Sequence, residues 1–415
     1  MSGWLGRLLL ALVSLALACG VAEWGLRLTG YGALYEVYSK PELFWRHDER
    51  LGWSLEPGAR GRYRGPRPFP VEFDTAIEIN ALGLRGPEPA PRAEGELRVL
   101  VLGDSVVAGF EVEQHETFVA RVEELLRRRF AQPISVINAG VRGYGTDQSL
   151  LWFRERGRAL APDLVVAVFS TNDFDDNLTL HRPRRPFGKG AFALRPSGAL
   201  ELVGVPVPRY PLCSAWVLDA AYQPARIDGS FARSACQLQT RLADHSALFT
   251  LLATALGRLP GVVNLLKSGS EADPEGAAVA ASLLPWPARP ARAAGAPGVA
   301  PDEAAGGLRA RLERELTTAL LQALAREVRA NGARFLLLIT PRIWQRLDTR
   351  ALLADQIEPF AVTLSPAIRL GQLRFRNDSH LNAPGHRWFA DGLAPLVEQE
   401  LRTRLRERAG VPNSR

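Results

Sequence analysis

The chain has almost no lysine. Of its 51 basic residues only Lys40, Lys189 and Lys267 are lysines, and the arginine-rich remainder gives a formal net charge of +7. No segment interleaves basic residues with aromatic ones along a stripe, so the sequence does not predict a protein that binds nucleic acid. A charge of this size permits only a mild attraction to anionic surfaces.

Cysteine and histidine are also scarce, with three and six residues respectively. Cys19 lies in an apolar segment, which leaves Cys213 and Cys236 as an even pair. In an oxidising compartment these two either form a disulfide or remain as unrelated thiols. Four histidines are scattered without the spacing of a metal-binding motif: His47, His115, His181 and His245. We therefore expect neither a metal nor a cofactor.

Charged residues are absent from residues 8–22, just before Glu23. Trp4 and Trp24 flank this run, as aromatic residues do at membrane interfaces. With its flanks the run reaches the roughly 20 residues that a spanning helix needs. Residues 1–29 are thus predicted to be a transmembrane anchor or a cleaved signal segment, and continued apolar sequence favours the anchor. Both interpretations place the remainder outside the cytoplasm.

Strand and helix patterns alternate through most of the chain after residue 96. Strands are predicted at 97–102, 134–138, 163–170 and 335–340, and helices at 118–130, 146–160, 308–331 and 383–408. Such alternation predicts an α/β fold with a parallel sheet and helices on both faces, a three-layer α/β/α sandwich.

Four regions surround or interrupt this pattern. Residues 30–96 are rich in Pro, Gly and Arg and include an alternating strand pattern at 71–79, which predicts a β-rich lead-in. The α/β domain then comprises 97–180 and 307–410. The insertion between them, 181–306, has a first part that we expect to be folded. Its second part, 268–306, is rich in Ala, Pro and Gly and is predicted to be disordered.

Polar segments follow the predicted strands at the point where each strand ends. Gly103-Asp104-Ser105 follows the first strand, residues 138–145 include the end of the second, and Ser170-Thr171-Asn172-Asp173 follows the third. A fourth segment, residues 377–382, contains Asp378 and His380. Because ligand sites of open α/β sheets lie at the carboxyl ends of the strands, we expect these segments to meet at one edge.

The residue types in these segments suit acyl transfer. A serine hydroxyl needs a base to become a good nucleophile, and His380 can remove the proton of Ser105 while Asp378 orients the imidazole. An oxyanion would need hydrogen-bond donors. The N–H groups of Ser105 and Gly143 and the side-chain amide of Asn172 are candidates for that role.

Other polar residues near these segments have competing interpretations. His386 is either a rival base or a packing residue, and Asp104 is expected to bind local N–H groups. A cluster of acidic residues either holds a cation or lies on a solvated loop, which we favour: Asp173, Asp175 and Asp176. Three arginines after it either attract an anionic glycan at the cleft mouth or are solvated, which is again favoured: Arg182, Arg184 and Arg185.

The four segments resemble the conserved blocks of the SGNH (GDSL-type) hydrolase superfamily. By this resemblance Ser105 is the nucleophile, Gly143 and Asn172 bind the oxyanion, and Asp378 and His380 are acid and base. The segment Asn80-Ala81-Leu82-Gly83-Leu84-Arg85-Gly86 resembles that of bacterial membrane-anchored members. The resemblance implies a flavodoxin-like three-layer fold and metal-free ester hydrolysis or acyl transfer, often on carbohydrates or lipids.

The chain departs from the family pattern in three places, of which the first is minor: Val106 follows Ser105 where the family often has Leu. Ser170 replaces the usual Gly of the third block, and Asp378 is two residues from His380 where many members have three. The shorter spacing resembles alginate acetylation proteins, which raises transferase chemistry. A Gly-x-Ser-x-Gly motif is absent, which disfavours an α/β-hydrolase.

The sequence thus predicts a serine esterase or O-acyltransferase of the bacterial cell envelope, anchored in the membrane with its domain outside the cytoplasm. Its expected substrate is an acyl ester, O-acetyl or another short acyl group, on an envelope polysaccharide or lipid. The alternative is a non-catalytic glycan-binding protein that retains the same scaffold.

Overall fold

The structure is a computed structural model that describes residues 2–28, 45–65, 71–180, 188–207, 217–218, 224–225, 238, 242, 245–256, 301–339, 346–362 and 370–410. Several predictions lie outside the described residues: the Cys213–Cys236 pair, the three arginines at 182, 184 and 185, and the disordered stretch as far as residue 300. Residues 301–306, the end of that predicted stretch, belong instead to a helix.

The centre of the molecule is a five-stranded sheet in the order β13-β12-β7-β5-β6. Its strands are β5 (Leu97–Gly103), β6 (Ile134–Gly140), β7 (Leu164–Phe169), β12 (Arg334–Ile339) and β13 (Pro359–Ala361). Every neighbouring pair is parallel, as predicted. Numbered along the chain, the order is 2-1-3-4-5, which is the flavodoxin-like arrangement with its switch point between the first and third strands.

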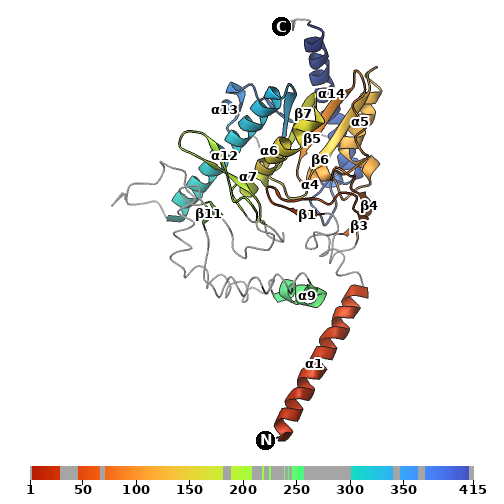
Figure 1. Cartoon of the computed structure of the whole chain (residues 1–415), viewed down its shortest axis with the longest axis vertical. Coiled ribbons are helices and arrows are strands. Elements are labelled where there is room, and N and C mark those ends of the chain that lie inside the picture. Colours follow the sequence, from red (N-terminus) through yellow and green to blue (C-terminus); the bar gives the residue numbers. More distant parts are fainter. Residues whose placement is uncertain are drawn as a thin grey trace, which may run out of the picture.

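Helices cover both faces of this sheet (Figure 1). On one face lie α5 (Phe118–Arg127) and α14 (Ala383–Arg408), and on the other α6 (Thr146–Glu155) and α12 (Pro301–Ala330). The side chains of β5 alternate between two hydrophobic cores: Leu100 and Leu102 belong to one, Val99 and Val101 to the other. This period of two is what a strand buried on both faces requires, and it confirms the three-layer sandwich.

Helix α12 begins seven residues earlier than the sequence pattern predicts, at Pro301 rather than 308. Proline is favoured at the first helical position because its missing N–H has no partner there in any case. The residues that follow, Glu303, Ala304 and Ala305, are good helix formers. Their Ala- and Pro-rich composition resembles the preceding low-complexity stretch, which is why composition alone assigned them to it.

Short helical elements join the strands at the edges of the sheet. They are α4 (Ser105–Ala108), η1 (Gln114–Glu116), η2 (Gly157–Leu160), α7 (Asp173–Asn177), α13 (Thr349–Ala354) and η4 (Leu370–Gln372). The first and fourth of these directly follow β5 and β7, so they lie at the carboxyl edge of the sheet. That edge is where parallel sheets bind their ligands.

The lead-in forms two antiparallel hairpins, β1 (Trp45–Asp48) with β2 (Gly52–Leu55) and β3 (Arg60–Gly65) with β4 (Phe73–Glu78). Strand β4 alternates strictly between buried and exposed residues, as the sequence predicts for a half-buried strand. Trp53, Tyr63 and Ile77 are fully buried in the same core as α6 and α12. The lead-in therefore packs on the main domain and shares one of its hydrophobic cores.

Within the insertion the structure describes two further antiparallel pairs and one helix. The pairs are β8 (Ala191–Leu194) with β9 (Leu200–Val203) and β10 (Val217–Leu218) with β11 (Pro224–Ala225), and the helix is α9 (Ala247–Leu256). Phe192 of β8 is buried in the main core, which joins this part of the insertion to the α/β domain.

The N-terminal helix α1 (Ser2–Leu28) lies apart from the three layers, with α9 beside its C-terminal end (Figure 1). An 18-residue window of its segment Gly3–Leu28 has a mean hydropathy of 2.1, and the segment is long and apolar enough to cross a membrane. Its leucines, apart from the partly buried Leu26, and both tryptophans are exposed rather than packed on the core. Length, composition and exposure are those expected of a membrane anchor, and a signal sequence passes the same test.

Candidate active site

Ser105 is placed at the edge of the sheet by the abrupt change from β5 to α4. It is the first residue of that short helix, and Asp104 is its N-cap: the Asp104 carboxylate accepts a hydrogen bond of 2.9 Å from the Val106 N–H. A capping carboxylate of this kind fixes the start of a helix and thereby the direction of its first side chain. Asp104 thus has the local structural role that the sequence predicts.

Strand β6 holds α4 from beneath. A Cβ atom on Gly140 would lie 2.4 Å from the backbone nitrogen of Ala108, so only glycine permits this approach. The buried amide of Asn138 donates a 2.9 Å hydrogen bond to the Val107 carbonyl and accepts one of 3.0 Å from the Gly140 N–H. The Asn-x-Gly sequence at the end of β6 therefore supports the backbone of α4, a role that sequence reasoning missed.

Ser105, His380 and Asp378 form one hydrogen-bonded chain. The Ser105 Oγ lies 2.8 Å from His380 Nε2, across 275 residues of sequence. On the other side of the ring, His380 Nδ1 lies 2.5 Å from Asp378 Oδ1, and the same oxygen accepts the His380 backbone N–H at 2.8 Å. The two bonds from one carboxylate fix both the backbone and the ring of His380.

A tight turn before α14 brings the acid and the base to this edge. Arg374 and Leu381 form an isolated antiparallel bridge, and the Phe375 N–H donates to the His380 carbonyl at 3.3 Å. Asn382 ends the turn and caps α14, because its Oδ1 accepts the Gly385 N–H at 2.9 Å. The turn closes within eight residues, which suits the short Asp-x-His spacing.

Charge favours a protonated imidazole in this position. Burial works against the charged form of His380, but the nearby Glu111 carboxylate and the hydrogen bond with Asp378 prevail, so its pKa is raised above 6.5. Burial likewise opposes ionisation of Asp378, yet its bonds with His380 lower the pKa of that carboxyl. The pair therefore stabilises the imidazolium that forms when the ring accepts a proton.

A second carboxylate, Glu111, faces the same ring nitrogen, and the sequence analysis did not identify it. Its Oε1 lies 3.3 Å from His380 Nδ1 and 2.5 Å from Arg142 Nη1, and both Glu111 and Arg142 are almost completely buried. The Arg142 guanidinium also lies over the rings of Tyr63 and Phe110. Glu111 and Arg142 are 31 residues apart, and no local pattern marks two such residues as a buried pair.

Glu111, Asp378 and His380 are the one group of ligand-type side chains, among the residues that the structure describes, whose donor atoms all lie within 4.8 Å of one another. The Arg142 guanidinium shares the Glu111 oxygen nearest the ring. A fixed positive charge already balances this carboxylate, so we interpret the group as an ion-pair network around His380.

The expected oxyanion residues lie on the loops that follow β6 and β7. Gly143 has a φ of +83° in the turn between β6 and α6, a conformation that favours glycine. Asn172 precedes α7, and its Nδ2 donates a 2.8 Å hydrogen bond to Asp176 Oδ2. An amide carries two N–H groups, so this bond fixes the side chain while using one of them.

The acidic cluster after β7 is largely buried, contrary to the solvated loop that the sequence favours. Asp173 and Asp176 are buried in α7, and Thr146 donates a 3.0 Å hydrogen bond to Asp173 Oδ2. Burial and then the charges of Asp104 and Asp176 raise the pKa of Asp173 well above its ordinary value. The loop is buried because Phe174 packs against Phe169 in the core.

His386, the rival base, makes a structural contact instead. It is buried in the first turn of α14, where Nδ1 accepts the Phe118 N–H at 3.1 Å and the ring stacks on Phe118. Burial, followed by the charges of Arg85 and His380, lowers the pKa of His386 to about 3. A neutral ring that accepts a backbone N–H joins α14 to the start of α5.

The lead-in braces the loops that carry the site. Trp53 donates its indole N–H to the Arg142 carbonyl at 3.1 Å, and the Tyr144 hydroxyl donates to the Trp53 carbonyl at 2.6 Å. Glu72 accepts both the backbone and the side-chain N–H of Asn377. Arg85 donates to the carbonyls of Ala108 and Val112 around α4. The lead-in thus contacts the second and fourth of the polar segments and the residues that follow Ser105 in and after α4.

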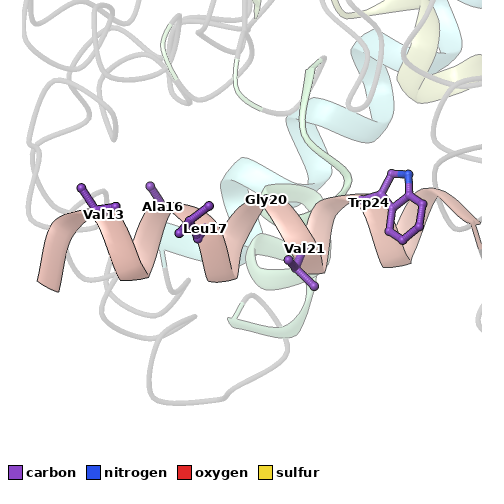
Figure 2. A pocket seen from close by; sticks show the side chains of 6 residues that line it. All are labelled: Val13, Ala16, Leu17, Gly20, Val21 and Trp24. Carbon is purple, nitrogen blue, oxygen red and sulfur yellow. The ribbon is translucent and has the colours of Figure 1, made fainter. Parts of the chain in front are cut away.

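An apolar recess lies along α1, far in sequence from these groups. Figure 2 shows the residues that line it, all on this one helix: Val13, Ala16, Leu17, Gly20, Val21 and Trp24. The only polar side-chain atom among them is the indole nitrogen of Trp24. The recess is a feature of the apolar helix surface rather than a site for chemistry.

The model of the GDSL-like lipase/acylhydrolase family matches residues 101–388, more than half of the chain and both ends of the Ser105–His380 contact. A search of curated proteins finds no match.

Among solved structures, the chain is similar to TesA, with 11% identity, a TM-score of 0.33 and coverage of 73% of this chain and 99% of that one. A GDSL-like lipase from Bacteroides thetaiotaomicron has 12% identity and a TM-score of 0.31, over 75% and 92% of the two chains. A mutant of Axe2, an acetyl-xylooligosaccharide esterase from Geobacillus Stearmophilus, has 11% identity and a TM-score of 0.30, over 72% and 92%. Identities and TM-scores this low support no conclusion about the function of this chain.

Proposed function

Because the chain belongs to the GDSL-like lipase/acylhydrolase family, we propose that it is a serine esterase whose nucleophile is Ser105. The observation that carries the proposal is the 2.8 Å contact between Ser105 Oγ and His380 Nε2, continued through Nδ1 to Asp378. A hydroxyl, an imidazole and a carboxylate in this order are what nucleophilic acyl transfer needs.

In the first half of the proposed reaction, Ser105 Oγ attacks the carbonyl carbon of the ester and its proton moves to His380 Nε2. Asp378, bound at Nδ1, stabilises the resulting imidazolium. The Ser105 and Gly143 N–H groups and the Asn172 amide are the proposed donors to the oxyanion. His380 then returns the proton to the departing alcohol, which leaves an acyl group on Ser105.

In the second half, a nucleophile releases the acyl group. Water attacks the acyl carbon, gives its proton to His380, and the carboxylic acid departs as the proton returns to Ser105 Oγ. A sugar hydroxyl in place of water would give an O-acylated glycan through the same steps. Analysis of the products with an added glycan acceptor separates hydrolysis from transfer.

We also propose that the substrate is an O-acyl ester on an envelope polysaccharide or lipid, with α1 as the membrane anchor that holds the domain outside the cytoplasm. Two features support this location: the exposed apolar surface of α1 and a span long enough for a bilayer. An anchored domain with an edge-of-sheet site would meet esters close to the membrane surface.

The direct test uses the full chain in detergent with p-nitrophenyl acetate. We expect Ser105→Ala to lose at least about 10³-fold in kcat/KM, and a fluorophosphonate probe to label Ser105 in the parent protein. Ser197→Ala, in an exposed turn, is the matched control and should keep the parent rate. Equal rates for the parent and Ser105→Ala would refute the esterase and leave the glycan-binding alternative.

A further inference from the structure

Two carboxylates approach the imidazole of His380 from the same side, and only one belongs to the proposed triad. Asp378 Oδ1 lies 2.5 Å from Nδ1 and Glu111 Oε1 lies 3.3 Å from it. The Asp378 side chain is 15% exposed, whereas that of Glu111 is 1% exposed. Glu111 is therefore the deeper and more shielded of the two charges.

The placement of Glu111 is fixed by its surroundings. It follows α4 in the chain, and Phe110 beside it is fully buried. Its Oε1 is bound by Arg142 at 2.5 Å, while its Oε2 is buried with no hydrogen-bond partner among the described residues. A buried oxygen without a partner is costly, which a purely structural ion pair would avoid by binding both oxygens.

We propose that Glu111, held by Arg142, is a positioning residue that stabilises the protonated imidazole of His380 during acyl transfer. The proposal rests on the esterase function proposed above. Among the described residues, Glu111 and Asp378 favour protonation of this ring, and Arg142 opposes it. The ring of His386, also near His380, is neutral and adds no charge. The negative charge of Glu111 offsets the positive charge of Arg142. With the charge of Asp378 added, His380 Nδ1 faces a net negative charge.

Glu111→Gln tests this role because it removes the charge and keeps the shape. The change removes a negative charge near the ring and leaves the positive charge of Arg142 uncompensated, so it lowers the pKa of His380. We expect the acid limb of kcat/KM to move to lower pH and kcat to fall about tenfold at its plateau, with KM unchanged. Glu111→Asp, which keeps the charge, should restore most of the parent profile.

A titration of the His380 ring by NMR, in the Ser105→Ala background, gives a readout that does not depend on activity. Its signal is identified by its loss in His380→Gln. The matched control Glu124→Gln, an exposed residue of α5, should leave the titration unchanged. An unchanged His380 pKa in folded Glu111→Gln would overturn the proposal even if the protein is an active esterase.

Asp378→Asn covers the case in which Glu111→Gln does not fold. With Asp378 neutral, burial and Arg142 oppose protonation of the ring, and Glu111 is the one carboxylate left against it among the described residues. Adding Glu111→Ala to Asp378→Asn should therefore lower the His380 pKa further. Equal His380 pKa values in Asp378→Asn and in the double variant would show that Glu111 does not stabilise the imidazolium, and would equally overturn the proposal.

A separate observation concerns the insertion, which is joined to α1 by a set of hydrogen bonds. The Glu23 carboxylate accepts the N–H groups of Ala247 and Leu248 at 2.9 and 2.8 Å and the Ser246 hydroxyl at 2.9 Å. Arg27, one helical turn further along α1, donates to the His245 carbonyl at 3.0 Å. Glu23 thus caps the N-terminus of α9, the position where a carboxylate is most favourable.

Helix α9 contains no charged residue in its ten positions, Ala-Leu-Phe-Thr-Leu-Leu-Ala-Thr-Ala-Leu. At 1.5 Å per residue it is about 15 Å long, half of what is needed to cross a bilayer. Leu252 is 52% exposed, and Leu238 and Leu242 earlier in the same segment are also exposed. These apolar side chains need a covering that the described residues do not provide.

We infer that α9 lies in the interfacial layer of the bilayer beside the end of α1, with its exposed leucines against lipid. We assign lipid as the partner of this surface because Glu23 binds α9 to the C-terminal end of α1. If α1 spans the membrane, that end lies where the bilayer begins. Helices that lie at the interface bury an apolar face at the headgroup boundary. The insertion would then hold the domain at the membrane surface, in addition to the covalent link between α1 and the lead-in.

The test uses the full chain in vesicles of phosphatidylcholine and phosphatidylglycerol, with a dansyl-bearing amino acid incorporated in place of Leu252. Leu82, an exposed residue of the lead-in, is the matched control position. Nitroxide lipids labelled at the headgroup should quench position 252 at least twofold more than position 82. Glu23→Gln should bring the two values closer by weakening the cap.

Flotation of the vesicles shows first that the chain is inserted, which separates this test from a failure of the anchor itself. Equal quenching at positions 252 and 82 in floated protein would overturn the membrane contact of α9. Quenching at 252 that does not change in Glu23→Gln would overturn the role of Glu23 as its attachment. Neither readout depends on esterase activity.

Discussion

At the scale of a single residue, the surroundings of His380 determine the protonation state of its imidazole. Burial disfavours its charged form, whereas the charge of Glu111 and the hydrogen bond with Asp378 favour it and prevail. A base works only when deprotonated, so a raised pKa delays the onset of activity as pH increases. The same raised pKa makes the ring a better proton acceptor once the ester is attacked.

We therefore expect kcat/KM for p-nitrophenyl acetate to rise with pH through a single acid limb whose midpoint lies above 6.5, the ordinary pKa of histidine. The sign follows from the direction of the shift: a higher pKa in the folded protein keeps the base protonated to higher pH. A pH series of initial rates measures the midpoint. A midpoint clearly below 6.5 would contradict the electrostatics described for this ring.

Gly140 is a second residue whose effect can be predicted by itself. In Gly140→Ala the new Cβ would lie 2.4 Å from the Ala108 nitrogen and 2.6 Å from Val107 Cβ, so α4 must shift away from β6. We expect a loss of about 1–3 kcal/mol in the free energy of unfolding, measured by denaturant titration, and a reduced kcat because Ser105 moves with α4.

Gly371→Ala is the matched control, because a Cβ there meets nothing within 4 Å. It should change neither stability nor rate. Full activity in Gly140→Ala would mean that Ser105 does not depend on the contact between α4 and β6.

At the scale of elements, the site depends on how α14 is attached to its neighbours. His386 in its first turn accepts the Phe118 N–H at the start of α5. The ring is neutral because its pKa lies near 3 in the folded protein, against 6.5 as the ordinary value. The unfolded chain thus binds this proton at a higher pH than the folded one, so stability is lost as pH falls from 6.5 towards about 3.

His386→Asn removes this titration and keeps an acceptor for the Phe118 N–H. At pH 7 we expect the parent to be the more stable protein, because it retains the stacking on Phe118. Between pH 6.5 and 4 the difference in unfolding free energy between the two should shrink. Denaturant titrations at several pH values measure it, with the exposed His115→Asn as control; a constant difference would speak against a buried neutral ring.

The elements also show what the sequence can and cannot predict. Four strands of the sheet follow from long apolar runs, but β13 spans only Pro359–Ala361 and is too short to show a pattern. The hairpin β3–β4 was half predicted: β4 alternates cleanly, whereas β3 is an Arg- and Gly-rich segment whose strand form depends on its partner. Pairing between strands is a tertiary effect that local composition does not encode.

The same division holds for the candidate site. Ser105, Asp378 and His380 lie in motifs with a recognisable order of residue types, and the structure places them within hydrogen-bond distance. Glu111 and Arg142 lie in no such motif, because their pairing depends on two loops that meet only in the folded sheet. The buried state of Asp173 was also missed, since exposure of a polar loop depends on what packs over it.

The whole molecule combines a switch-point site with an N-terminal apolar helix. The strand order places β5 and β7 side by side, so the loops after them open at the same edge. The N-terminal helix α1 is exposed along most of its length and lies outside both hydrophobic cores. A helix of this composition is more stable in lipid than in water. Whether the mature protein keeps α1 or loses it as a cleaved signal segment therefore decides how the whole molecule meets a membrane.

We expect the protein expressed in a bacterial host to stay in the membrane fraction after alkaline carbonate treatment and to require detergent for release. Its intact mass should include residues 2–28, because we propose α1 as an uncleaved anchor. Mass spectrometry and sequencing of the N-terminus measure this directly. A mature chain that begins after Cys19 would identify the segment as a cleaved signal and remove the anchor.

The separation of Ser105 from His380 by 275 residues has a consequence for biosynthesis. A ribosome that has made the sheet strands β5 to β7 has produced the proposed nucleophile without its proposed base, because residues 378–380 are translated much later. The nascent polypeptide therefore holds an unactivated hydroxyl until that segment is made. The proposed triad is complete only when the turn before α14 has folded against β5.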